Sequence, residues 1–155
     1  MDNLKQSLEI EKNMSKYLDA SLEAGKEFYK NFKDKGKVVM LNLLKFKVTA
    51  DYSGIDKLKP NTEISGEEAY QLYIKSTLPE LEKAGSRIVY FGRSRNFLIG
   101  PESEKWDAIL LVEHESVLKF MEFAQNPDYL KNAGHRIAAL EDSRLLPSNE
   151  IKNYI

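Results

Sequence analysis

The sequence predicts an α+β protein built on one antiparallel sheet. Three short segments rich in β-forming apolar residues, at 38–46, 87–92 and 106–113, alternate with two segments of helical spacing, at 65–85 and 116–125. A last short apolar run lies near the end of the chain, so the elements follow the order β-α-β-β-α-β. This order is typical of the ferredoxin-like arrangement, in which both helices cover one face of the sheet.

Residues 1–35 are expected to be a helical extension, and residues 36–150 the ferredoxin-like domain. Ser15 fits the N-cap position of the extension helix, and Gly36 marks its end. One stripe with helical spacing runs between them and needs a surface to pack on, either the main domain or a second subunit. It comprises Tyr17, Leu18, Ser21, Leu22, Phe28, Tyr29 and Phe32.

The middle of the chain carries clear start and stop signals. Residues 47–64 are rich in Asp, Ser, Gly and Pro and are expected to form a long loop. Ser65 and Glu68 have the spacing of a capping box and predict the start of a helix that ends near Gly85. Pro79 lies inside this helical pattern and predicts a kink or a break about one turn before it.

The second half is expected to continue with strands at 87–92, 96–99, 106–113 and 144–147. Ser116 fits the N-cap of the helix that follows the third of them. Asn126 and Pro127 then restart the helix, with asparagine as the cap and proline at the first helical position.

The predicted strands are apolar on both faces. In the first strand Met40 and Leu44 lie on one face, and Leu41 and Leu43 on the other. Helices cover only one face of such a sheet, and a contiguous apolar face is unusual on a soluble monomer. We therefore expect a homodimer whose sheets pack face to face as a dimeric α+β barrel. The alternative is that the N-terminal helix folds across the open face.

Composition narrows the classes of function. The absence of cysteine excludes disulfides, thiolate metal sites and cysteine nucleophiles. A net charge of −1 disfavours a protein that coats nucleic acid or an anionic membrane, and no apolar run has the length of a membrane span. We expect a cytoplasmic protein with no nucleic-acid or membrane partner. Two distant histidines and the lack of a Gly-rich phosphate loop predict no metal site and no bound cofactor.

Several runs of residues resemble one family. They are Met40 to Phe46, Gly66 to Tyr70 with Tyr73, Trp106-Asp107, Pro127 to Tyr129, and His135 to Leu145. Through these runs, residues 37–147 resemble the bacterial domain-of-unknown-function 1330 family of the dimeric α+β-barrel superfamily. The resemblance implies a ferredoxin-like subunit and a barrel dimer, and it implies no established activity. The resemblance also leaves haem as an alternative ligand, since barrel dimers of this superfamily can bind it.

The chain departs from that family after the third strand. His114-Glu115-Ser116 stands where the family usually carries a Tyr-Pro-Ser pattern. The resemblance therefore implies no role for His114, and we expect this residue to have an ordinary surface or rim position.

A polar cluster near the end of the chain is the strongest candidate for chemistry. We expect His135 to act as a general base, Asp142 to orient it, and Arg136 and Arg144 to hold an anionic substrate. A helix-end position is expected to favour the charged form of His135. The alternative is a structural network in which the same four residues pin the last helix to the last strand.

Four further residues are candidates for substrate binding. Asn42 is polar on an apolar strand face, so its amide must meet either a backbone partner or a ligand. Tyr70 faces the sheet, either as core or as a donor in a cavity wall. Trp106 and Asp107 point to opposite faces of their strand, with an arginine as the expected partner of the carboxylate.

These features predict a small-molecule-binding protein with a pocket between sheet and helices or between subunits. One hypothesis is a cofactor-independent enzyme, monooxygenase- or isomerase-like, acting on a small anionic or aromatic substrate. The other is a non-catalytic ligand-binding or structural dimer.

Overall fold

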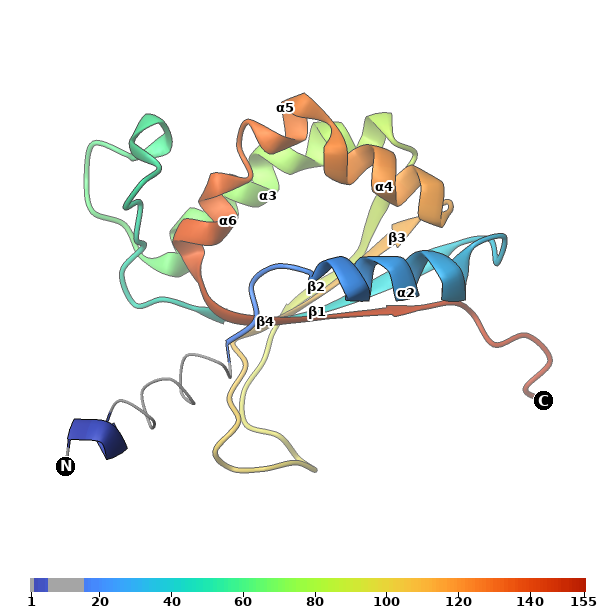
Figure 1. Cartoon of the computed structure of the whole chain (residues 1–155), viewed down its shortest axis with the longest axis horizontal. Coiled ribbons are helices and arrows are strands. Elements are labelled where there is room, and N and C mark those ends of the chain that lie inside the picture. The colour runs from blue at the N-terminus through green and yellow to red at the C-terminus, as the bar shows by residue number, and fades with distance from the viewer. Residues whose placement is uncertain (1, 6–15) are drawn as a thin grey trace.

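The computed structural model describes residues 2–5 and 16–155 (Figure 1). The predicted N-cap at Ser15 lies outside the described residues. From residue 16 onward the elements are α2 (Leu22–Phe32), β1 (Val38–Phe46), η1 (Asp56–Leu58), α3 (Gly66–Lys83), β2 (Arg87–Arg93), β3 (Ala108–His114), α4 (Val117–Gln125), α5 (Pro127–Leu130), α6 (Gly134–Ala139) and β4 (Leu140–Ser148).

The strands form one antiparallel sheet in the order β2-β3-β1-β4. β1 is central and pairs with β3 on one side and β4 on the other, so that Asn42 lies between Leu110 and Leu145. β2 pairs with the other edge of β3. The chain therefore has the ferredoxin-like α+β fold that its order of elements predicts.

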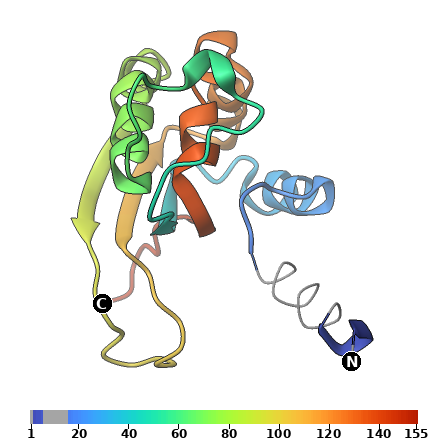
Figure 2. The ribbon, with the colours of Figure 1, turned by 90° about the vertical axis from the view of Figure 1, so that its left-hand side faces the viewer.

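Helices α2 to α6 lie together on one side of the sheet (Figures 1 and 2). The helix-facing side chains of β1 and β3 are buried, among them Leu44 and Leu110, and they pack against Tyr70 of α3. Gly66 begins α3 where no side chain fits, because a Cβ at this position would lie 2.2 Å from the carbonyl oxygen of Lys47. This close approach fixes the start of α3 against the end of β1.

The opposite face of the sheet carries an apolar centre that no described helix covers. The strand registers place Leu41 beside Leu111 and Leu146, and Leu43 beside Ile109. Leu146 remains 61% exposed. Both faces of the central strands are thus apolar, as the sequence predicts.

The helical extension differs from the prediction. α2 begins only at Leu22, with Ser21 as its N-cap, because residues 16–20 are not helical and the backbone of Tyr17 is hydrogen-bonded to Asp142 and Ser143 of β4. The helix packs on the helix side of the sheet, where the rings of Phe28 and Phe120 stand 5.4 Å apart. The alternative that this helix covers the open face is therefore wrong for the described residues.

Two other local predictions are also wrong. α3 continues through Pro79 to Lys83, so the expectation of a break is wrong. No strand forms at 96–99, which belongs to a loop extending away from the helix layer (Figure 1). No described helix is long and apolar enough to cross a membrane.

Candidate functional site

A cavity of about 400 Å³ lies between the helix-facing side of the sheet and the helices above it. Its walls are largely apolar and aromatic. The polar side chains that line it come from residues 16–20 before α2, here called the strap, from two strands and from three helices; they are Asp19, Asn42, Tyr70, Tyr73, Thr77, His114, Tyr129 and Arg136. A cavity of this size with few polar groups is typical of small-molecule sites.

Three tyrosines form one wall of the cavity. The hydroxyl groups of Tyr73 and Tyr129 are hydrogen-bonded at 2.8 Å, and the rings of Tyr70 and Tyr73 are 5.2 Å apart. Burial raises the pKa of both Tyr70 and Tyr73, so both phenols stay protonated at neutral pH. They can serve this cavity as hydrogen-bond donors but not as bases.

The Tyr70 hydroxyl is not engaged by the other two tyrosines. It has no hydrogen-bond partner among the described residues, and none of their fully buried side-chain oxygens or nitrogens lacks a partner. Its oxygen therefore keeps contact with the space of a cavity. Tyr70 also lines a smaller pocket on its other side, so its ring separates the two hollows.

Arg136 brings a positive charge into the cavity. Its guanidinium donates to the carbonyl oxygen of Leu18 at 2.6 Å and to the hydroxyl of Ser143 at 3.3 Å, and both acceptors are neutral. No ion pair joins Arg136 to a carboxylate among the described residues. Asp19, an exposed residue of the strap, is the acidic side chain among those that line the cavity.

Asn42 lies on the floor of the cavity, on β1. Its amide nitrogen donates to the carbonyl oxygens of Leu110 at 3.2 Å and Met40 at 3.4 Å. Of the two predicted alternatives, a backbone partner or a ligand, the amide nitrogen has the backbone partner. The amide oxygen is left as an acceptor facing the cavity.

His114 is placed differently from the prediction. It is 2% exposed rather than a rim residue, because it continues the helix-facing row of β3 beneath α4. Its Nδ1 is 2.7 Å from the hydroxyl of Ser86, and its ring meets those of Phe120 and Phe123 at 5.0 and 5.7 Å. The sequence signal for this position was the two-residue spacing that places His114 on the same strand face as Leu110 and Val112.

The expected pairing of His135 with Asp142 does not form among the described residues. The Nδ1 of His135 is 2.8 Å from the hydroxyl of Tyr52, on the loop after β1. His135 also lies in the first turn of α6, where the helix dipole disfavours a positive charge, and burial lowers its pKa. The expected preference for the charged form is therefore wrong.

Asp142 and its neighbours bind the strap instead. The Asp142 carboxylate accepts from the backbone N–H of Tyr17 at 2.8 Å and from Arg144 at 2.7 Å. The Ser143 hydroxyl donates to the carbonyl oxygen of Tyr17 at 2.5 Å. Arg136 and Ser143 join α6 to β4, but His135 is not part of this network, so the structural alternative holds only for its other members. Asp142 also binds a segment more than a hundred residues away in sequence.

Trp106 and Asp107 lie away from the 400 Å³ cavity. The Arg144 guanidinium lies over the rings of Tyr17 and Trp106, at 4.7 and 4.9 Å from their centres. Asp107 accepts from the backbone N–H of Phe46 at 2.7 Å, so its partner is backbone rather than an arginine. It lines the smaller pocket, which holds about 210 Å³.

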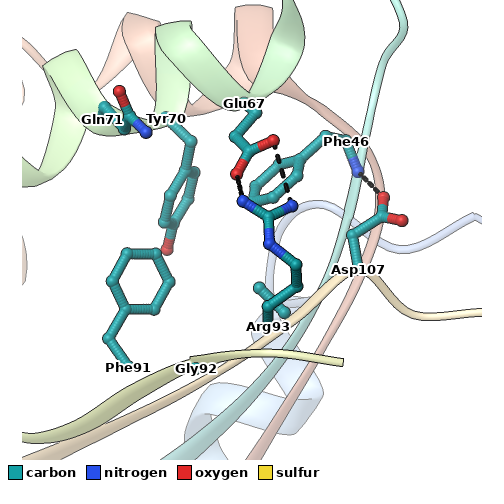
Figure 3. Close-up of a pocket in the computed structure, with 9 residues that line it drawn as sticks. Phe46, Glu67, Tyr70, Gln71, Phe91, Gly92, Arg93 and Asp107 are labelled. Carbon is teal, nitrogen blue, oxygen red and sulfur yellow. Dashed lines mark hydrogen bonds and ion pairs between the residues drawn. The ribbon is translucent and has the colours of Figure 1, made fainter. Parts of the chain in front are cut away.

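Figure 3 shows this smaller pocket at the start of α3. An ion pair between Arg93 and Glu67 joins β2 to α3 across it, and the Tyr70 ring descends from α3 toward Phe91. Arg93 and Glu67 are paired with each other, so the guanidinium of this pocket is engaged by a carboxylate, unlike that of Arg136. Among the described residues no group of three potential ligands is placed to hold a metal ion.

The fold and the site together define a ferredoxin-like α+β protein with a ligand-sized cavity beneath its helices. No protein-family model and no curated protein matches the chain, so its membership of the domain-of-unknown-function 1330 family stays a prediction.

Comparison with solved structures gives a closer relation. A crystal structure of the methylated RPA0582 protein shares 33% identity at a TM-score of 0.79, over 91% of this chain and 99% of that chain. A second structure, of the RPA0582 protein of unknown function from Rhodopseudomonas palustris, shares 34% identity at a TM-score of 0.77, over 88% of this chain and 98% of that chain. The chain belongs to the same family as the RPA0582 protein.

A more distant likeness is to a dimeric protein of unknown function with a ferredoxin-like fold from Bacteroides fragilis. It shares 14% identity at a TM-score of 0.40, over 74% of this chain and 96% of that chain. A likeness this remote carries no argument about assembly or activity.

Proposed function

We propose that this chain is a small-molecule-binding protein whose ligand is a small anion with an apolar or aromatic body. The observation that carries the proposal is Arg136, a guanidinium that lines an aromatic-walled cavity and meets only neutral acceptors among the described residues. Arginine binds carboxylates and phosphates through two parallel hydrogen bonds, and such bonds strengthen where water is excluded. Arg136 is therefore assigned the anionic group of the ligand.

The remaining polar groups are assigned supporting contacts. The Tyr70 hydroxyl is a donor, and the amide oxygen of Asn42 is an acceptor on the cavity floor. The volume of about 400 Å³ suits a ligand of drug-like size or smaller. Of the residues predicted from sequence, Asn42, Tyr70 and Arg136 are retained as ligand-binding residues. A base at His135 is not part of this proposal, because its expected orienter is engaged elsewhere.

Calorimetric titration with phenylpropanoate tests this assignment. Replacing Arg136 by glutamine keeps a polar side chain but removes the charge. The affinity should fall about tenfold or more, because a hydrogen bond to a charged group contributes about 1.5–3 kcal/mol. Arg95→Gln is the matched control, since Arg95 is exposed and, among the described residues, donates only to the carbonyl oxygen of Ser94. Equal loss in both variants, or no binding by the wild type, would contradict the proposal.

We further propose that the protein is a homodimer whose open sheet faces pack together. The face has an apolar centre around Leu41 and Leu111 and a charged rim, which includes the Arg87–Glu113 ion pair. A dry centre with a polar rim is the usual anatomy of a protein interface. The loop between β2 and β3 adds another apolar side chain to this surface, Leu98, which is 99% exposed.

Sedimentation equilibrium at micromolar concentration tests the dimer. Leu146→Lys places a charge on the open face and should raise the dissociation constant at least about tenfold, since burying an unpaired charge is costly. Val48→Lys is the control, because Val48 is 92% exposed and lies beyond the end of β1. A wild-type monomer at this concentration would refute the assembly.

A further inference from the structure

His114 is a buried polar residue that the proposed function does not use. It lines the same cavity as Arg136 yet comes from the opposite end of the sheet. His114 pairs with Val38, the first residue of β1, whereas Arg136 contacts Ser143, which pairs with Leu44. Six residues of strand span about 20 Å. Met40 and Asn42, which lie between these positions on β1, also line the cavity.

One ring nitrogen of His114 is held and the other is available. Nδ1 shares a hydrogen bond of 2.7 Å with the hydroxyl of Ser86, itself 5% exposed. Nε2 has no partner among the described residues, although none of their fully buried side-chain nitrogens is left unpaired. Nε2 therefore keeps contact with the cavity, which the imidazole lines.

The environment keeps this imidazole neutral. Phe120 and Phe123 contact the ring, and burial lowers its pKa from 6.5 to about 4. A neutral imidazole has one donor and one acceptor nitrogen. Since the Ser86 hydroxyl can donate to Nδ1 or accept from it, Nε2 can accordingly donate or accept. It suits a hydroxyl or carbonyl oxygen of a ligand, and the neutral ring has no positive charge to attract a second anion.

We propose that His114 is a second ligand-binding residue of this cavity, and that the ligand is an acid bearing a hydroxyl or carbonyl group at the end remote from its anionic group. Ser86 is the positioning residue that fixes the imidazole. This inference rests on the proposed function, because Arg136 is taken to bind the anionic end. It narrows the ligand class of that function from any apolar anion to an acid with a second polar group.

Paired acids that differ in one hydroxyl test the inference by calorimetry. The probes are phenylpropanoate with its para-hydroxy derivative, and decanoate with ω-hydroxydecanoate, which differ in reach. In at least one pair the wild type should bind the hydroxylated acid about tenfold more tightly, because the acid satisfies a buried nitrogen. His114→Phe should abolish this preference while changing the affinity for the plain acid less than about threefold.

A second variant and a spectroscopic measurement cover the case in which His114→Phe fails to fold. Ser86→Ala should reduce the preference, since it frees the ring to turn. The nitrogen resonance of His114 Nε2 should shift on addition of the hydroxylated acid and not with the plain acid. A purely structural histidine would show the same response to both acids.

The outcomes separate the two proposals. If Arg136→Gln weakens both acids but the wild type has no hydroxyl preference, or His114→Phe retains it, the role of His114 is overturned and the anion site stands. If neither acid binds the wild type, the proposed function fails and the inference fails with it.

Discussion

Acid should destabilise this protein through His114. The folded pKa of about 4 lies below the ordinary value of 6.5, because burial removes the water that would solvate the charged ring. Between these values the unfolded chain binds a proton that the folded chain does not. The stability that His114 contributes is thus fully present above pH 6.5 and is lost as the pH falls toward about 4.

The magnitude follows from the two pKa values. Each pH unit between 6.5 and about 4 is equivalent to about 1.4 kcal/mol, so the free energy of unfolding should fall by about 3 kcal/mol over the interval. Since native domains are stabilised by only about 5–15 kcal/mol, such a loss is readily measured.

Urea denaturation from about pH 7 to about pH 4, at fixed protein concentration, measures this loss. The comparison is between the wild type and His114→Phe, with His114→Gln as a second variant. Carboxylates and His135 titrate in all three proteins, so the difference between the curves isolates His114. The variants should lose about 3 kcal/mol less than the wild type. Curves that run parallel would refute the buried, neutral histidine.

Three other predictions concern the framework around the cavity. Gly66→Ala should destabilise the fold by about 1–3 kcal/mol, because its Cβ would meet the backbone of Lys47, whereas Gly25→Ala has open space and should be neutral or stabilising in the same urea titration. Ser65→Ala should cost about 1 kcal/mol in urea by removing the capping box with Glu68, and an unchanged midpoint would contradict that role. Asp142→Asn weakens the acceptor for Tyr17, so limited proteolysis should cut the strap severalfold faster; an unchanged rate would show that the strap is held otherwise.

Local signals in the sequence were enough to predict most of the fold. The apolar run at 38–46, the Ser65–Glu68 box and the Asn126-Pro127 pair act over a few residues, and each lies where it was expected. The two-sided strands are equally local in origin, since a strand alternates its faces at every residue. The break expected near Pro79 does not form, because burial of the α3 face outweighs one lost hydrogen bond.

The site was harder to predict because its partners are distant in sequence. Asp142 binds the backbone of Tyr17, 125 residues away, and no periodicity reports such a contact. The roles of the two histidines were mispredicted for a similar reason: His114, expected at the surface or rim, lines the cavity, whereas His135, expected as the base, does not. Whether each imidazole faces a cavity depends on which helix packs above it, and that is decided by the tertiary arrangement of α4 and α6.

A crystal structure with bound phenylpropanoate tests the central claim, the anion site at Arg136, most directly. We predict the carboxylate within hydrogen-bond distance of the Arg136 guanidinium and the phenyl ring against Tyr70 and Tyr73, in the cavity between sheet and helices. A carboxylate bound instead at Arg93, in the smaller pocket, would contradict the account.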